Sequence, residues 1–245
     1  MVTTVDSDLE ARRAAVKIHL AAALRWFAEL DFDEGAAGHL SARDPINPEL
    51  FWINPEGHPF ELMTASGLAL VDAAGTVHAG PGAPSRSALA LHRAVYAARP
   101  DVQSAMHAHP VHTKAWSALR RLLDPINQEA CIFYGCHTIF DEYGGPFSDE
   151  REAPKVAASL DGGNVAVILR NHGLLTVGAS VGAAAYRFMI FDRSVRAQVI
   201  AEAAGSPVHI APEVASLLAV EEGHCERSFT PILTSLRTRH PDLAT

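Results

Sequence analysis

Two histidines stand two residues apart in the segment Met106-His-Ala-His-Pro110, and this spacing has a direct chemical use. On a β-strand, residues i and i+2 point to the same side, so the imidazoles of His107 and His109 can converge on one ion. A third histidine, His172, follows the most apolar run of the chain, in Asn171-His-Gly173. Three nitrogen ligands leave positions open for water or substrate, as catalytic metals require. The sequence therefore predicts a divalent-metal site; the alternative is three partly buried histidines that bond to the backbone.

Hydrophobic periodicity predicts the elements that carry these residues. Apolar residues recur at helical spacing over 8–30, and further helices are expected at 87–98, 111–119 and 181–204. Strands with tight turns are expected within 38–44, 51–55, 68–77, 102–109, 130–134 and 165–169. The run 165–169 is almost unbroken in its apolar character, which is typical of a strand buried on both faces. Because α/β sheets present ligand-binding residues where strands end, His172 is well placed for a site.

The C-terminal stretch 206–245 has a different character from the rest of the chain. It contains Pro207, Pro212 and Pro231, and it predicts turns with one short helix over 213–221. No internal repeat, low-complexity segment or linker divides the sequence. We therefore expect a single α/β domain over 1–245, with a core at about 8–205 and a C-terminal tail at 206–245.

Composition excludes several classes of protein. The 245 residues are 48% hydrophobic and 20% charged, which provides for a buried core, and the net charge of -8 forms no basic stripe for nucleic acid. The first residues carry charges where a signal peptide needs an apolar core, and no window has the roughly 18 apolar residues of a membrane span. Three cysteines without a CxxC pair suit a reducing compartment. We expect a cytoplasmic protein that binds a small molecule, and no nucleic acid or membrane.

The segment Gly178-Ala-Ser-Val-Gly182 matches the GxSxG pattern of serine hydrolases, between an apolar strand and a helix. Ser180 is equally well placed to cap the following helix by accepting hydrogen bonds from its first backbone N–H groups. Asp192 would lie inside that same helix, a poor place for a triad member, although His209 or His224 could be invoked. The sequence therefore favours a helix cap over a nucleophile.

Several separated segments, in this order, resemble the class II aldolase/adducin domain family over about residues 10–205. They are Gly38-His-Leu-Ser-Ala-Arg-Asp44, Trp52-Ile-Asn-Pro-Glu-Gly57, His92 with Tyr96, Arg99-Pro-Asp101, His107-Ala-His-Pro110 and Asn171-His-Gly-Leu-Leu-Thr-Val-Gly178. The resemblance implies a three-layer α/β/α fold with a mainly antiparallel central sheet. It also implies a homotetramer with active sites at subunit interfaces.

By the same resemblance, His107, His109 and His172 would bind one divalent metal per chain. Zinc is the usual metal, and Fe(II) and Mn(II) are the alternatives. The metal would polarise the oxygens of the substrate and stabilise an enediolate while a carbon–carbon bond breaks.

The sequence departs from the sugar-phosphate aldolases of this family at the catalytic carboxylate. Those enzymes carry a glutamate four residues before the helix histidine, where this chain has Ala88. Alanine moves no proton, and a general acid/base contributes about 10²–10⁴-fold in rate. Glu56 would repel a phosphate, whereas Arg86 can hold a carboxylate by two hydrogen bonds. The expected substrate is thus a small acid other than a sugar phosphate, with these candidate binding residues: Arg86, His39, Asn54 and Glu56.

Tyr134 and His137 are the candidates to replace the missing acid/base, because a phenol and an imidazole can both donate and accept protons. The alternative for Tyr134 is a core aromatic residue with a capped hydroxyl. Aldolases of the family often supply a tyrosine from the adjacent subunit, so either residue could act across an interface. His112 lies near the metal motif on a predicted helix and is expected to face away from it.

Three functions follow from these features. The first is a metal-dependent lyase that cleaves a carbon–carbon bond of a hydroxy- or oxo-acid by a retro-aldol reaction or decarboxylation. The second is a non-haem Fe(II) oxygenase that oxidatively decarboxylates an arylpyruvate-type acid, as a small branch of the family does, although nitrogen-only ligation is unusual for such iron. The third is a binding module like adducin. Adducin-type members lack the metal histidines, so their retention here favours an enzyme.

Overall fold

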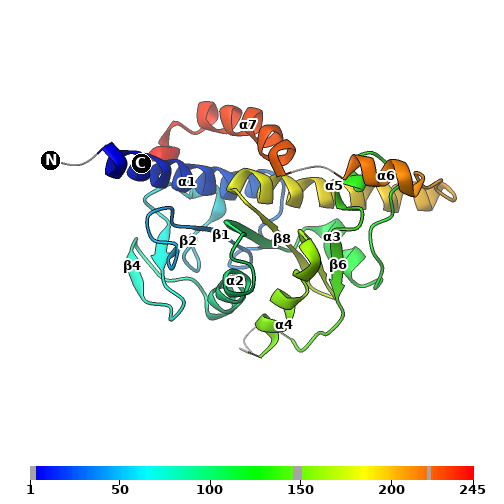
Figure 1. Cartoon of the computed structure of the whole chain (residues 1–245), viewed down its shortest axis with the longest axis horizontal. Helices are drawn as coiled ribbons and strands as arrows, with labels where there is room; N and C mark the ends of the chain where they lie inside the picture. Colours follow the sequence, from blue (N-terminus) through cyan, green and yellow to red (C-terminus); the bar gives the residue numbers. More distant parts are fainter. Residues whose placement is uncertain (1–3, 146–150, 220–221) are drawn as a thin grey trace.

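An eight-stranded sheet forms the centre of the computed structural model, which describes residues 4–145, 151–219 and 222–245 (Figure 1). In spatial order its strands are β4 (Val77–Ala79), β3 (Ala69–Val71), β2 (Phe51–Ile53), β1 (His39–Arg43), β5 (Ser104–Ala108), β8 (Gly173–Gly178), β7 (Ala166–Leu169) and β6 (His137–Phe140). All neighbours pair antiparallel except β6 and β7, which are parallel. The expected mainly antiparallel sheet is confirmed.

Helices cover both faces of this sheet. They are α1 (Thr4–Glu29), α2 (Arg86–Ala98), α3 (Val111–Ser117), α4 (Glu152–Ala158), α5 (Val181–Ala204), α6 (Pro212–Leu218) and α7 (Glu222–Arg239). Short 3-10 turns lie at Phe60–Leu62, Ala130–Phe133, Asp161–Gly163 and Pro241–Ala244. In Figure 1, α1, α5 and α7 lie above the sheet, and α2 and α4 lie below it. The α/β/α layering that the family resemblance implies is confirmed.

The alternation of side chains along the strands explains the two layers of core. On β1, Leu40 and Ala42 pack toward α1 and α5, in a cluster with Phe27 and Phe188. A second cluster on the opposite face joins strand residues to apolar residues of α2 and α4, such as Leu91. Because successive strand residues point to opposite faces, the odd-numbered residues of β1 face α2. The polar residues of β1 therefore lie on the α2 side.

One strand predicted from the sequence is wrong. Residues 130–134 were expected to be extended, but Ala130–Phe133 form a 3-10 turn and the strand begins at His137. The Asn127 side chain starts this turn by accepting a hydrogen bond from the Ala130 N–H at 2.8 Å. All four residues of the turn are buried, so their apolar run resembles a buried strand in sequence.

The C-terminal stretch contains more helix than the sequence predicted. The short helix is observed at Pro212–Leu218, and the last two residues of the predicted span, 220–221, lie outside the described residues. The long helix α7 was not predicted, because Pro231 lies inside it. Its buried residues Cys225, Phe229 and Leu236 follow helical spacing and join the core beside α1 and α5.

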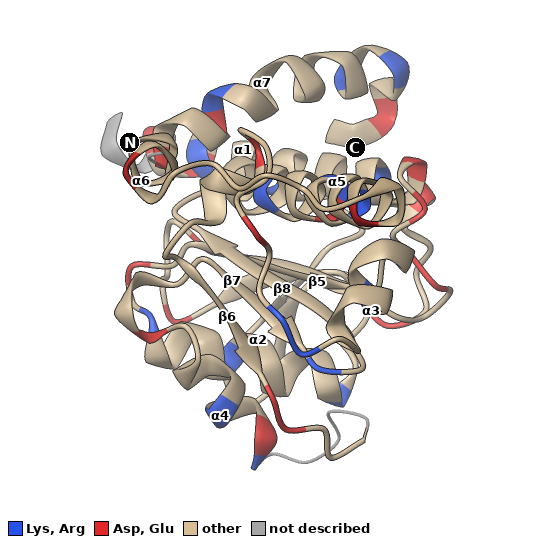
Figure 2. Cartoon of the chain, turned by 90° about the vertical axis from the view of Figure 1, so that its right-hand side faces the viewer, with Lys and Arg blue, Asp and Glu red and all other residues tan. Residues whose placement is uncertain are grey.

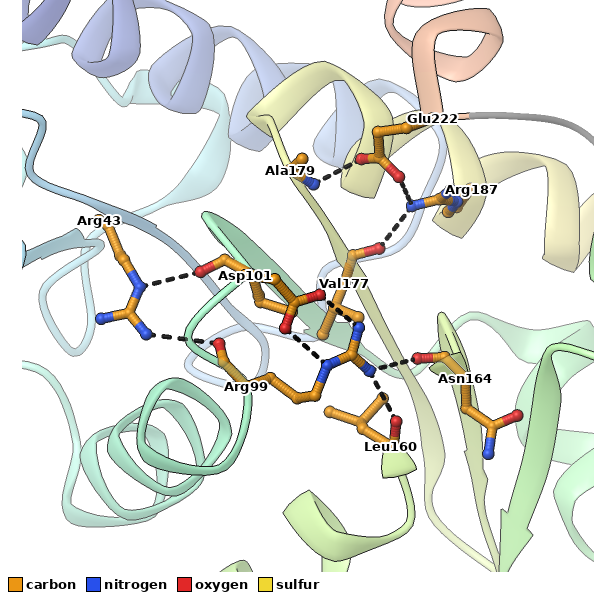
Figure 3. A network of polar contacts seen from close by, with 10 residues as sticks. Arg43, Arg99, Asp101, Leu160, Asn164, Val177, Ala179, Arg187 and Glu222 are labelled. Carbon is orange, nitrogen blue, oxygen red and sulfur yellow. Dashed lines mark hydrogen bonds and ion pairs between the residues drawn. The ribbon is translucent and has the colours of Figure 1, made fainter. Parts of the chain in front are cut away.

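Polar contacts attach α7 to the rest of the fold. Arg187 of α5 is buried, donates to the Val177 carbonyl at 3.0 Å and pairs with Glu222 of α7 at 2.6 Å (Figure 3). The Glu222 carboxylate also accepts a hydrogen bond from the backbone N–H of Ala179. The region called a tail in the sequence therefore packs as part of the fold.

Charged residues of both signs are interspersed on the helices, as Figure 2 shows for α4 and α7. Within the described parts of the chain, no helix is both long and apolar enough to cross a lipid bilayer.

Candidate metal centre

Three histidine rings meet at one end of the sheet. His107 lies on β5, His109 follows that strand by one residue, and His172 lies in the turn between β7 and β8. The ring centroids are 4.8 Å apart for His107 and His109, 4.8 Å for His107 and His172, and 4.6 Å for His109 and His172. One nitrogen from each ring lies within 4.8 Å of the other two. The convergence predicted from the sequence is therefore present.

Local backbone structure brings His172 to this position. The turn after β7 closes with a hydrogen bond of 3.0 Å from the His172 N–H to the Leu169 carbonyl. Asn171 has a φ of 57°, a left-handed conformation that asparagine adopts more readily than most residues. Strand β8 then pairs with β5, where Leu174 lies opposite Ala108.

The outer nitrogens of two rings have fixed partners. His107 Nδ1 lies 2.9 Å from the Leu174 carbonyl, an acceptor, so Nδ1 carries the proton and Nε2 has the lone pair. His109 Nδ1 lies 3.6 Å from the carboxylate of Glu34, which is also paired with Lys114. Partners of this kind orient imidazoles that bind metals. No local pattern pointed to Glu34, because it lies in the irregular loop after α1.

This arrangement fits a metal better than it fits a set of structural histidines. The Nε2 atoms of His107 and His109 lie 3.1 Å apart, and because the proton of His107 is on Nδ1, its Nε2 presents a lone pair toward His109. When His109 is protonated at Nδ1, the nitrogen on the side of Glu34, two Nε2 lone pairs face each other, and a cation between them would relieve their repulsion. Burial lowers the pKa of His107 well below its ordinary value, and it lowers the pKa of His172 to about 4. Neutral imidazole is the form that binds a metal.

We expect the metal-free protein to lose stability in mild acid. Below the ordinary histidine pKa of 6.5, the unfolded chain takes up protons that His172, with a folded pKa of about 4, does not. Its contribution to stability is therefore present above pH 6.5 and is lost as the pH falls toward 4. Urea unfolding of the metal-free protein should show a lower midpoint at pH 5 than at pH 7.5. A smaller change of the midpoint with pH in His172→Ala would assign the pH dependence to His172. A midpoint that is the same at both pH values in the parent protein would contradict the prediction.

His39 lies directly beside these three histidines. It pairs with His107 across the antiparallel strands β1 and β5, and the two ring centroids are 4.8 Å apart. Asn54 holds the start of β1, because its side chain accepts from the Leu40 N–H at 2.9 Å and donates to the Gly38 carbonyl at 3.4 Å. Both polar atoms of the Asn54 side chain are thus engaged by the backbone.

The other predicted substrate residues, Arg86 and Glu56, are exposed, and neither forms a hydrogen bond or ion pair with the three histidines within the described residues. Arg86 is the first residue of α2 and is exposed, and within the described residues its side chain has no hydrogen bond or ion pair. Glu56 is exposed on the loop after β2. Ala88 is buried on the α2 face that carries His92, so no carboxylate enters from that position.

The structure does not bring His137 to the three histidines within one chain. His137 begins β6 and lies level with Ala166, at the opposite end of β7 from the turn that holds His172. Its Nδ1 donates to the Phe133 carbonyl at 2.6 Å, and its Nε2 accepts from the Leu123 N–H at 3.0 Å. Both ring nitrogens therefore have backbone partners. Tyr134 is half-buried after the 3-10 turn, and its role as a proton donor stays a prediction.

His112 also has a structural partner. Its Nδ1 lies 3.1 Å from the buried carboxylate of Asp192 on α5. The same carboxylate accepts hydrogen bonds from the backbone and the hydroxyl of Thr113 at 2.9 and 2.8 Å. His112 thus faces α5, which gives it a structural role.

Ser180 is the N-cap of α5, as predicted. Its hydroxyl oxygen accepts from the Ala183 N–H at 3.0 Å and donates to Glu226 of α7. We expect Ser180→Ala to cost about 1 kcal/mol of unfolding free energy, the usual effect of losing a cap, and to leave turnover and metal content unchanged. Chemical denaturation and metal analysis measure both effects. Complete loss of an esterase activity in this variant would restore the hydrolase hypothesis.

The polar segment Arg99-Pro-Asp101, which also carries the family resemblance, stabilises loops. Arg99 pairs with Asp101 at 2.7 Å and donates to the carbonyls of Leu160 at 2.6 Å and Asn164 at 3.1 Å (Figure 3). Arg43 donates to other carbonyls of the same region. Arg99 and Asp101 come before the start of β5, whereas His107 and His109 lie at the end of that strand.

Comparison with known proteins identifies the family. A family model described as Class II Aldolase and Adducin N-terminal domain matches residues 18–199. Decarboxylase NovR of Streptomyces niveus is 39% identical, with 95% of this chain and 88% of NovR covered. The 4-hydroxy-3-prenylphenylpyruvate oxygenase/4-hydroxy-3-prenylbenzoate synthase of Streptomyces roseochromogenus subsp. oscitans is 38% identical, with 95% and 85% covered.

A solved structure agrees with this assignment. L-fuculose 1-phosphate aldolase from Glaciozyma antarctica PI12 superposes with a TM-score of 0.87 at 34% identity, with 96% of this chain and 94% of the aldolase covered. Sequence, fold and the three-histidine cluster therefore lead to one conclusion. The chain belongs to the class II aldolase/adducin family.

Proposed function

We propose that this protein is a metal-dependent enzyme that cleaves a carbon–carbon bond of a small oxo- or hydroxy-acid, with decarboxylation as the leading case. The observation that carries the proposal is the three-histidine cluster, in which one nitrogen from each ring lies within 4.8 Å of the other two. The name of the relative NovR, a decarboxylase, supports this reaction. A divalent ion held by His107, His109 and His172 would act as a Lewis acid on the oxygens of the substrate.

The residues around the cluster favour an acid over a sugar phosphate. Arg86, exposed at the start of α2 and without a side-chain partner among the described residues, is our candidate for the substrate carboxylate, since a guanidinium binds a carboxylate with two hydrogen bonds. Asn54 acts by holding the turn that carries His39. Glu56 stays a candidate for an outer polar group of the substrate. Ala88 leaves the site without the aldolase carboxylate, so the proton donor must come from elsewhere, and Tyr134 of a neighbouring subunit is our candidate.

Oxidative decarboxylation of an arylpyruvate-type acid is the second candidate, and the oxygenase relative favours it. When a 3-oxo acid loses carbon dioxide, the electron pair moves into the neighbouring carbonyl. When a 2-oxo acid does so, the pair remains on the carbonyl carbon itself, where a Lewis acid cannot delocalise it. With an oxidant such as dioxygen, the reaction can proceed without forming that carbanion. The nature of the acid thus separates the two candidates.

The test combines metal analysis with oxygen uptake. Protein purified without chelator or affinity metal is assayed for its metal content, and a second sample is loaded anaerobically with Fe(II) and given arylpyruvates or hydroxy-acids. Zinc or manganese near one ion per chain, with carbon dioxide released and no oxygen consumed, supports the lyase. Iron with oxygen uptake that depends on substrate supports the oxygenase. Absence of any bound metal would overturn both and favour an adducin-like binding module. Light scattering tests the homotetramer that the family resemblance implies.

A further inference from the structure

Four buried side chains form a continuous hydrogen-bonded chain that ends beside the three histidines. The Tyr96 hydroxyl lies 2.7 Å from Ser41 Oγ, and Ser41 Oγ lies 2.6 Å from His92 Nδ1. His92 Nε2 lies 2.8 Å from His39 Nδ1. All four side chains are buried, and His39 keeps 8% of its surface exposed.

Secondary structure places these residues opposite one another. His39 and Ser41 are two residues apart on β1 and face the same side, and His92 and Tyr96 are four apart on α2 and share one helix face. The two strand residues thus face the two helix residues, and each hydrogen bond of the chain joins one residue of β1 to one residue of α2. The four residues belong to segments that resemble the family, but only the packing of α2 on β1 reveals that they form one unit.

The direction of the protons along this chain can be worked out from the need to satisfy buried donors. Burial raises the pKa of the Tyr96 hydroxyl, so it stays protonated and must donate. Within the described residues, Ser41 Oγ is its hydrogen-bond acceptor. Ser41 then donates its own proton to His92 Nδ1, because the reverse would leave a buried hydroxyl without an acceptor, at a cost of about 1–3 kcal/mol.

The same reasoning determines which ring nitrogen carries the proton in His92 and in His39. Because His92 Nδ1 accepts a proton from Ser41, the proton of neutral His92 is on Nε2 and is donated to His39 Nδ1. Neutral His39 therefore carries its proton on Nε2, the atom on the other side of its ring. In any other arrangement along these contacts, either the Tyr96 or the Ser41 hydroxyl loses its acceptor.

We propose that this chain makes His39 a hydrogen-bond donor to an anionic or carbonyl oxygen of the substrate, rather than a fourth metal ligand. A nitrogen that carries a proton has no lone pair to offer a metal, whereas it can bind a carboxylate or oxo oxygen. His92, Ser41 and Tyr96 are positioning residues that act through His39. The inference deepens the proposed function, since it assigns the group that recognises the oxygen atoms of the acid next to the metal.

The tautomers are measured directly by long-range proton–nitrogen NMR on zinc-loaded protein with ¹⁵N-labelled histidine. We expect His39 and His92 to be protonated at Nε2 and His107 at Nδ1. In Ser41→Ala, His92 Nδ1 loses its donor, and mixed tautomers are expected at His39 and His92. Ser104→Ala is the matched control, because this buried serine donates to the backbone carbonyl of Ser41 and leaves the chain intact. Protonation of His39 at Nδ1 in the parent protein would overturn the proposal, whatever reaction the enzyme catalyses.

A second measurement compares His39→Leu with His39→Gln, whose amide keeps an N–H donor. Both variants should retain one zinc per chain. In calorimetry with phenylpyruvate as the probe, we expect affinity to fall about 10- to 100-fold in His39→Leu, the usual range for a hydrogen bond to a charged group, and a few-fold in His39→Gln. Loss of zinc from His39→Leu would show that His39 is a ligand. Equal affinity in His39→Leu and the parent protein would also overturn the proposal.

Discussion

Replacing His172 by alanine is expected to remove the bound metal and the activity together. His172 supplies one of three ring nitrogens that lie within 4.8 Å of one another, and its imidazole is neutral at pH 7 because burial lowers its pKa to about 4. Loss of an outer hydrogen-bond partner alone costs a metal site roughly 10–100-fold in affinity, so loss of a ligand should cost more. Metal content after dialysis and turnover are the two measurements.

The design of this experiment separates ligand loss from general damage. His209→Ala is the control, since His209 is exposed and lies in the loop before α6. Circular dichroism should be the same for both variants. If His172→Ala still holds one metal ion per chain after dialysis, the ligand assignment is wrong.

Adding one methyl group at Gly173 is the second change with a large expected effect. A Cβ at this position would lie 2.6 Å from the backbone carbonyl oxygen of Ala108 and 2.9 Å from Cδ2 of His109. Neither atom is the end of a flexible side chain, so β8 must move away from β5 or the His109 ring must turn. Overpacking of this kind costs about 1–3 kcal/mol of stability. We expect Gly173→Ala to weaken metal binding about 10- to 100-fold, as other disturbances next to a ligand do.

Gly205→Ala is the matched control for this substitution. In the part of the chain that the structure describes, no atom outside the local backbone lies within 4 Å of a Cβ at Gly205, and its φ of 166° is extended backbone open to any residue. Competition with a chromogenic chelator gives the metal affinity, and thermal unfolding gives the stability. Parent-like affinity in Gly173→Ala would mean that the spacing between β5 and β8 does not hold the metal site together.

The parts of the site that the sequence could predict depend on local spacing. The HxH pattern on a strand identified His107 and His109, and the end of an apolar strand identified His172, because both signals lie within a few residues. The helix predicted at about 181–204 is observed at Val181–Ala204, and its start could be placed because Ser180 is a typical helix cap.

The parts that could not be predicted depend on contacts between distant segments. His39 was a candidate binding residue, but its place beside His107 arises because β1 pairs with β5, and neither segment alone contains the information for that pairing. Glu34 reaches His109 from a loop with no periodicity. His137 was predicted as a proton donor or acceptor because an imidazole can do both. Its two ring nitrogens instead form hydrogen bonds with backbone groups of Leu123 and Phe133, and the sequence around His137 does not indicate these contacts.

If the three histidines bind a metal as proposed, the amount of this protein in a cell would also depend on the supply of that metal. His107 and His109 lie at the end of β5, and His172 lies in the turn before β8. An ion bound to all three would therefore hold together segments that are far apart in the sequence. An ion that binds only the folded chain stabilises it by about 4.1 kcal/mol at a thousand times its dissociation constant. Metal starvation would then deplete the protein through proteolysis of the unfolded chain, beyond its effect on turnover.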